Sequence, residues 1–67
     1  MLDDNIYNIM EQLVTENLSL WHIKNYYMDD ASKDNEIKQV WNFVEKTKKE
    51  TIELLLERLK ERLHIDH

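Results

Sequence analysis

Few side chains in this sequence could form a catalytic or metal site. His64 and His67 are three positions apart and could share a metal ion, but the chain has no cysteine and shows no third fixed ligand. His22 falls on the polar side of a helical pattern, and the two serines, Ser19 and Ser32, have no recognisable base and orienting acid. Without glycine there is no phosphate-binding loop. The sequence therefore predicts no enzyme, no catalytic residue, no metal site and no cofactor.

Four polar residues interrupt two apolar helical faces at the same height. If the chain folds back about Ser32, residues whose numbers sum to about 64 lie side by side, which sets Glu16 level with Lys48. We expect a charge-assisted contact between Glu16 and Lys48, completed by Asn17 and Thr51. Such a polar layer typically fixes helix register and the choice of partner. A solvent-exposed rim and a small binding pocket are the alternative interpretations.

The aromatic residues are numerous for a short chain. At helical spacing, Trp21 and Trp41 fit core positions, whereas Tyr26 and Phe43 fall nearer the edges of their apolar faces. We therefore predict Tyr26 and Phe43 as a surface for a protein partner.

Composition restricts the fold class strongly. The chain has 67 residues with no Gly, Pro or Cys, so the strongest helix breakers, the usual hairpin-turn residues and disulfides are all absent. A formal charge of −5 disfavours nucleic-acid binding, which depends on neutralising phosphates. No apolar run is long enough for a membrane span, and Asp3 and Asp4 do not suit a signal peptide, so we expect a cytoplasmic protein.

Apolar residues at steps of three and four predict two helices in a single domain, 1–67. We expect a helix over about 3–28, a loop over about 29–34 and a second helix over about 35–64, with a break near Thr15 to Ser19 as an alternative. Asp3 or Asp4 can cap the first helix, and Ser32 or Asp34 the second. The first apolar set is Leu2, Ile6, Ile9, Met10, Leu13, Leu20, Trp21, Ile23 and Tyr27, and the second is Ile37, Val40, Trp41, Val44, Ile52, Leu55, Leu56, Leu59 and Leu63.

Both apolar faces are wider than one neighbouring helix can cover. More than about 100° of one helix is covered by Leu54, Leu55, Leu56 and Leu59. The other helix is covered over a similar arc by Ile9, Met10, Leu13 and Val14. A short loop implies antiparallel neighbours, and the remaining apolar surface requires a second layer. The predicted fold is an all-α antiparallel two-helix hairpin that pairs as a homodimer into a four-helix bundle.

The run from Ala31 to Lys38, with Lys49-Glu50 and the stretch from Leu54 to Glu57, resembles the second half of small ferritin-like hairpins. The encapsulated-ferritin type is the nearest, over about residues 30–57. The resemblance implies paired hairpins in a four-helix bundle that binds iron. In that family the second helix supplies a Glu and, three residues later, a His as ligands, and the matching positions here are Lys48 and Thr51. An ammonium group and a weakly coordinating hydroxyl would not hold iron, although the lysine could replace the metal's charge.

The function predicted from the sequence is that of a small non-enzymatic helical interaction or assembly module, with a second copy of itself as partner. A ferritin-like metal-binding protein is the first alternative. An RNA-binding helical hairpin is the second, because the chain is similar in size and helix arrangement to the dimeric regulator of plasmid copy number. The lysines and arginines of the second helix alternate with glutamates, which is typical of a solvated face.

Overall fold

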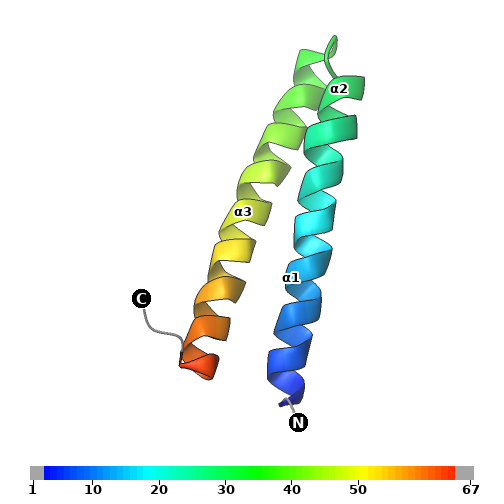
Figure 1. Ribbon diagram of the computed structural model, residues 1–67. Helices are drawn as coiled ribbons and strands as arrows, with labels where there is room; N and C mark the ends of the chain where they lie inside the picture. The colour runs from blue at the N-terminus through cyan, green and yellow to red at the C-terminus, as the bar shows by residue number, and fades with distance from the viewer. Residues whose placement is uncertain (1–2, 65–67) are drawn as a thin grey trace.

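The protein is an all-α hairpin of two long arms packed antiparallel (Figure 1). The computed structural model describes residues 3–64, so Leu2 and His67 of the sequence predictions lie outside the described residues. The first arm consists of α1 (Asp4–His22), a π-helical segment η1 (Ile23–Tyr27) and α2 (Met28–Asp30). The second arm is α3 (Asn35–Leu63). The extents of 48 × 21 × 16 Å are those of a thin rod.

The first arm has no break near Thr15 to Ser19, because α1 is continuous through these residues. The side chain of Asp3 accepts a hydrogen bond from the backbone N–H of Asn5 at 2.8 Å, which is the capping contact expected of a short acidic residue. The hydroxyl of Thr15 donates to the carbonyl of Glu11 and so starts no new helix. The arm extends to Asp30, two residues beyond the predicted end.

The π-helical segment is the feature of the first arm that the sequence did not predict. A π turn takes an extra residue, so the half-buried residue that follows Ile23 along the arm is Met28, five positions on. The side-chain amide of Asn25 donates to the carbonyl of Trp21 at 2.9 Å, just before this wider turn. Tyr27, a member of the first apolar set, is 42% exposed, and the centre of its ring lies 4.9 Å from that of Trp41.

The connection between the arms is shorter than predicted. The backbone N–H of Ser32 donates to the carbonyl of Asp29, and that of Asp34 to the carbonyl of Ala31, so a compact turn follows the helix directly. Asp34 caps α3, because its side chain accepts a hydrogen bond from the N–H of Ile37 at 3.2 Å. At the other end of α3, His64 adopts the left-handed conformation that commonly ends a helix.

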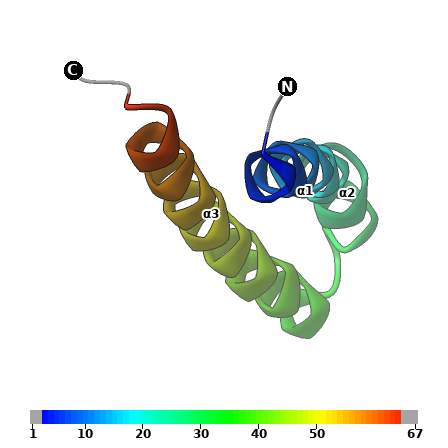
Figure 2. The same cartoon turned by 90° about the horizontal axis from the view of Figure 1, so that it is seen from below.

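The core lies between the two arms and is thin. Within residues 3–64 only three apolar side chains are buried, those of Leu13, Ile23 and Ala31, and only Ile23 is fully buried. The two arms are inclined to one another along their length (Figures 1 and 2). The remaining apolar residues between the arms are half-buried, and they are Ile6, Ile9, Leu20, Met28, Trp41, Val44, Ile52, Leu55, Leu59 and Leu63.

The predicted apolar faces are therefore each divided in the hairpin. Met10 and Trp21 of the first set, and Ile37, Val40 and Leu56 of the second, are exposed. The prediction that Trp21 belongs to the core is wrong for the single chain, since 48% of its surface is exposed. One helix can cover only part of an apolar face of this width. Among the described residues no helix is both long and apolar enough to cross a membrane.

Candidate functional site

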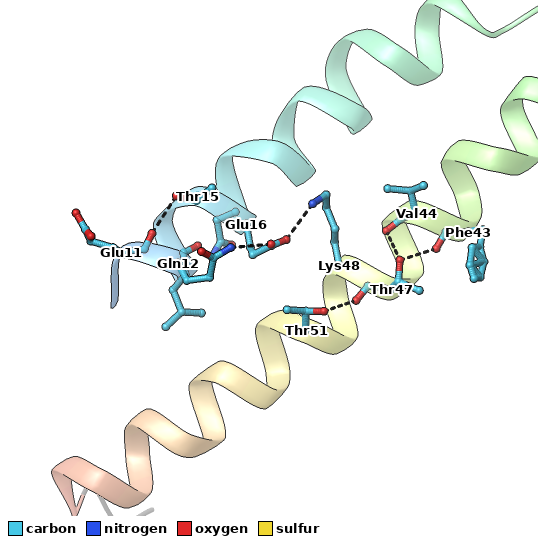
Figure 3. A network of polar contacts seen from close by, with 11 residues as sticks. Glu11, Gln12, Thr15, Glu16, Phe43, Val44, Thr47, Lys48 and Thr51 are labelled. Atoms are coloured by element: carbon cyan, nitrogen blue, oxygen red, sulfur yellow. Dashed lines mark hydrogen bonds and ion pairs between the residues drawn. The ribbon is translucent and has the colours of Figure 1, made fainter. Parts of the chain in front are cut away.

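An ion pair between Glu16 and Lys48 joins the two arms at mid-height (Figure 3). The Nζ atom of Lys48 lies 3.0 Å from Oε2 of Glu16, and the two side chains are only 24% and 15% exposed. The predicted contact is thus present, at the register expected from folding the chain about Ser32. It replaces an apolar contact in the middle of the interface between the arms.

The surroundings of the pair are apolar on both helices. Lys48 lies between Val44 and Ile52, one turn to either side on α3, and both of these are half-buried. Glu16 lies about one turn after the buried Leu13 on α1. The charges are therefore close to the core, where an unpaired charge would be costly.

Gln12 is a third member of the site that the sequence did not reveal. Its side-chain amide donates to Oε1 of Glu16 at 3.0 Å, so each carboxylate oxygen accepts one hydrogen bond. The spacing of four residues along α1 places Gln12 directly beneath Glu16 and is a recognisable signal for such a bond. Within residues 3–64 no buried side-chain nitrogen or oxygen lacks a hydrogen-bond partner. The site has the completed hydrogen bonding of a structural contact.

The hydrogen bond from Lys48 lowers the pKa of the Glu16 carboxyl below its ordinary value, because it stabilises the charged form. Partial burial acts in the opposite direction, and the bond from Gln12 and the charge of Lys48 lower the pKa further. Glu16 is consequently held in its ionised form, which is unsuitable for a general acid at neutral pH.

Asn17 and Thr51 do not complete the contact as predicted. The side-chain amide of Asn17 donates to the carbonyl of Leu13 at 2.8 Å, and the hydroxyl of Thr51 donates to the carbonyl of Thr47 at 3.0 Å. Short polar side chains in a helix readily bond to a carbonyl one turn earlier, which turns them away from the neighbouring helix. The polar layer between the arms is therefore Gln12, Glu16 and Lys48.

A looser group of charges lies nearer the connection. Oε1 of Glu45 lies 3.8 Å from Nζ of Lys24 on the first arm and 3.6 Å from Nζ of Lys49 on its own helix. Both lysines are about half exposed, so these pairs add little to stability. Lys24 thus extends from the edge of the apolar face to a surface carboxylate.

The predicted partner residues Tyr26 and Phe43 are both exposed, by 52% and 61%, but they lie on different arms. The ring of Tyr26 packs edge-on against Trp21, with 5.3 Å between the ring centres. Phe43 lies on α3 one turn from Thr47, whose hydroxyl bonds to the carbonyl of Phe43 (Figure 3). Both remain available for contact with another molecule.

Nothing between residues 3 and 64 resembles a metal centre, since no group of three or more His, Cys, Asp or Glu side chains is placed to hold an ion. His64 lies at the end of α3, and His22 packs against the ring of Trp21 at 5.4 Å. Lys48 and Thr51, at the positions of the ferritin-like ligands, take part in the contacts described above.

Comparisons with protein-family models, with curated proteins and with solved structures found no match. The functional interpretation accordingly depends on the contacts and exposed surfaces of the chain itself.

Proposed function

We propose that the protein is a small non-enzymatic helical interaction module that works as a homodimer, in which two hairpins form an antiparallel four-helix bundle. The observation that supports this proposal most strongly is the imbalance between buried and exposed apolar side chains. Between residues 3 and 64, three apolar residues are buried, whereas many large ones are at least one-third exposed. Exposed apolar surface of this extent marks an interaction site.

The stability of a single hairpin supports the same proposal. A chain of this size buries a smaller fraction of its surface than a larger domain does, and this one has no cysteine to form a disulfide. Full burial of a large apolar side chain contributes about 1.5–3 kcal/mol. These side chains are already about half buried, so covering four of them would contribute roughly 3–6 kcal/mol before the entropic cost of association, a sizeable part of the stability of a small domain. A second copy is the simplest source of such a cover, because most oligomers are symmetric.

In this proposal the Glu16–Lys48 pair has a positioning role. An ion pair near a core contributes little net stability, but it is disrupted when one helix slides along the other. The pair therefore favours a single register of the hairpin, and hence a single shape of the surface that the second copy contacts. The lysine ammonium in the place of a ferritin-like metal ligand supports a structural role over iron binding. Stoichiometric iron uptake by the purified protein would favour the ferritin-like alternative instead.

The proposal is tested by unfolding the protein at several concentrations. A dimer that gains its stability from association unfolds at a higher midpoint when the protein is more concentrated, whereas a monomer does not. We expect the urea midpoint to rise steadily over a hundredfold range of concentration. A midpoint that is independent of concentration would show that the hairpin is stable alone.

A further inference from the structure

A second apolar stripe runs along α1, separate from the residues that contact α3. It is called here the α1 outer stripe, and all its members are exposed, Val14 by 69% and Leu18 by 56%. Its residues are Tyr7, Met10, Val14, Leu18 and Trp21. Steps of three and four keep them on one side of the helix. The stripe is therefore a helix-packing surface against which no helix within residues 3–64 lies.

The stripe has the same spacing in both directions. Counted outward from Val14, the next members lie four and seven residues away on either side. An isologous contact brings a surface against its own copy, so that residue i contacts j and j contacts i. An antiparallel pair of α1 helices centred on Val14 would thus place Tyr7 against Trp21 and Met10 against Leu18, twice.

Charge distinguishes the antiparallel pair from a parallel one. Residues 3–23 contain the acidic Asp3, Asp4, Glu11 and Glu16 but no Lys or Arg, and Lys24 is the first cation of the chain. A parallel pair would bring the acidic N-terminal ends together. In the antiparallel pair centred on Val14, Asp4 of each copy lies level with Lys24 of the other, since these two numbers sum to twice 14. The side chain of Lys24 is 48% exposed, and its Nζ atom also lies 3.8 Å from Oε1 of Glu45 on α3.

The corresponding outer surface of α3 is less suited to self-association. Val40, Phe43 and Leu54 are exposed there, but the positions between them are Thr47 and Thr51. The hydroxyls of both threonines bond to backbone carbonyls of α3, and the two residues separate Leu54 from the other apolar side chains (Figure 3). The α1 outer stripe has no such interruption.

We infer that two copies of the chain associate through the α1 outer stripe, antiparallel and with the twofold axis near Val14. This inference rests on the proposed homodimer and specifies its contact surface. The two α1 helices lie against each other at the contact between the copies, and Trp21 of one copy covers Tyr7 of the other. The outer surface of α3, including Phe43, stays free for a different molecule.

The absence of native cysteine allows a direct test with single-cysteine variants. Val14→Cys introduces thiols on both sides of the proposed axis, where two β-carbons come within reach of a disulfide. Leu54→Cys is the matched control, an exposed apolar residue on the outer surface of α3. Under mild oxidation at about 10 μM protein we expect Val14→Cys to form disulfide-linked dimer about 100-fold faster than Leu54→Cys, because association raises the local thiol concentration to the millimolar range. In urea the two rates should become equal.

The cross-linking rates and the solution mass together distinguish the α1 interface, its register and the homodimer. Faster cross-linking of Leu54→Cys would overturn the α1 interface while leaving the homodimer in place. Slow cross-linking of both variants, with a wild-type protein that is dimeric in solution, would overturn the register centred on Val14. Slow cross-linking together with a monomeric wild type would overturn both the register and the proposed function. As a second measurement, Val14→Glu should weaken dimerisation at least about tenfold, whereas Leu54→Glu should not.

Discussion

Lys48 and Glu16 illustrate how a charged residue can occupy the middle of a helical interface. Nζ of Lys48 lies 3.0 Å from Oε2 of Glu16, and the other carboxylate oxygen, Oε1, accepts a hydrogen bond from Gln12. Removing two charges from water costs several kcal/mol, which a good pair approximately offsets. We therefore expect the pair to contribute to the choice of register more than to net stability. Its position was predictable from the sequence, because folding about Ser32 sets the two residues level.

Replacing Lys48 with methionine tests this role. Lys48→Met keeps the side-chain length and adds apolar surface, so we expect the helices to remain intact, with a loss of about 1–2 kcal/mol in the free energy of unfolding from the unpaired carboxylate. We further expect a mixture of oligomeric species in place of one. Circular dichroism measures the first effect and native mass spectrometry the second. Lys46→Met, at an exposed position two residues away, is the control; a single species identical to wild type for Lys48→Met would argue against a register role.

The lowered pKa of Glu16 makes the stability depend on pH in the acid range. In the unfolded chain a glutamate titrates near its ordinary value of about 4.3, and the folded protein holds the pKa of Glu16 below that. The folded state thus binds fewer protons, so the stabilisation is complete above the unfolded pKa and is lost as the pH falls through the folded pKa. Urea unfolding between neutral pH and about pH 3 should show a steeper decline for wild type than for Glu16→Gln. Equal slopes would mean that the folded protein does not hold the pKa of Glu16 below its value in the unfolded chain.

At the level of elements, the helices follow from composition and capping. Asp3 and Asp34 each cap the helix that follows, as short acidic residues at these positions predict. The π-helical segment could not be predicted, because apolar periodicity in the sequence assumes a constant number of residues per turn. The actual turn from Ile23 to Tyr27 is wider, and so Tyr27 is exposed where a regular helix would bury it.

The cap of α3 is a point at which a single element can be weakened. Asp34→Ala removes the acceptor of the Ile37 N–H, and we expect a loss of about 1 kcal/mol in the free energy of unfolding. Ser32→Ala is the control, since Ser32 was the other predicted cap but contributes its backbone N–H to the turn. Thermal unfolding at one fixed protein concentration provides the comparison. Equal losses in the two variants would show that the cap at Asp34 has no special importance for α3.

On the scale of the whole molecule, the sequence predicted the hairpin but not how its apolar residues divide between an inner and an outer surface. Trp21 and Ile23 both fall on the apolar face of one helical pattern, yet Ile23 is buried and Trp21 is half exposed. The division depends on where the second arm lies around the first, and that placement follows from packing between distant residues. The hydrogen bonds of Asn17 and Thr51 could not be predicted either. Each side chain bonds to a backbone carbonyl one turn earlier in its own helix instead of reaching the other arm.

We propose that one hairpin leaves too much apolar surface uncovered to exist alone. Light scattering coupled to size-exclusion chromatography measures the mass of the protein in solution directly. For the proposed homodimer we expect one species with a mass about twice the 8.2 kDa of the chain. A compact and stable species with the mass of a single chain would contradict it.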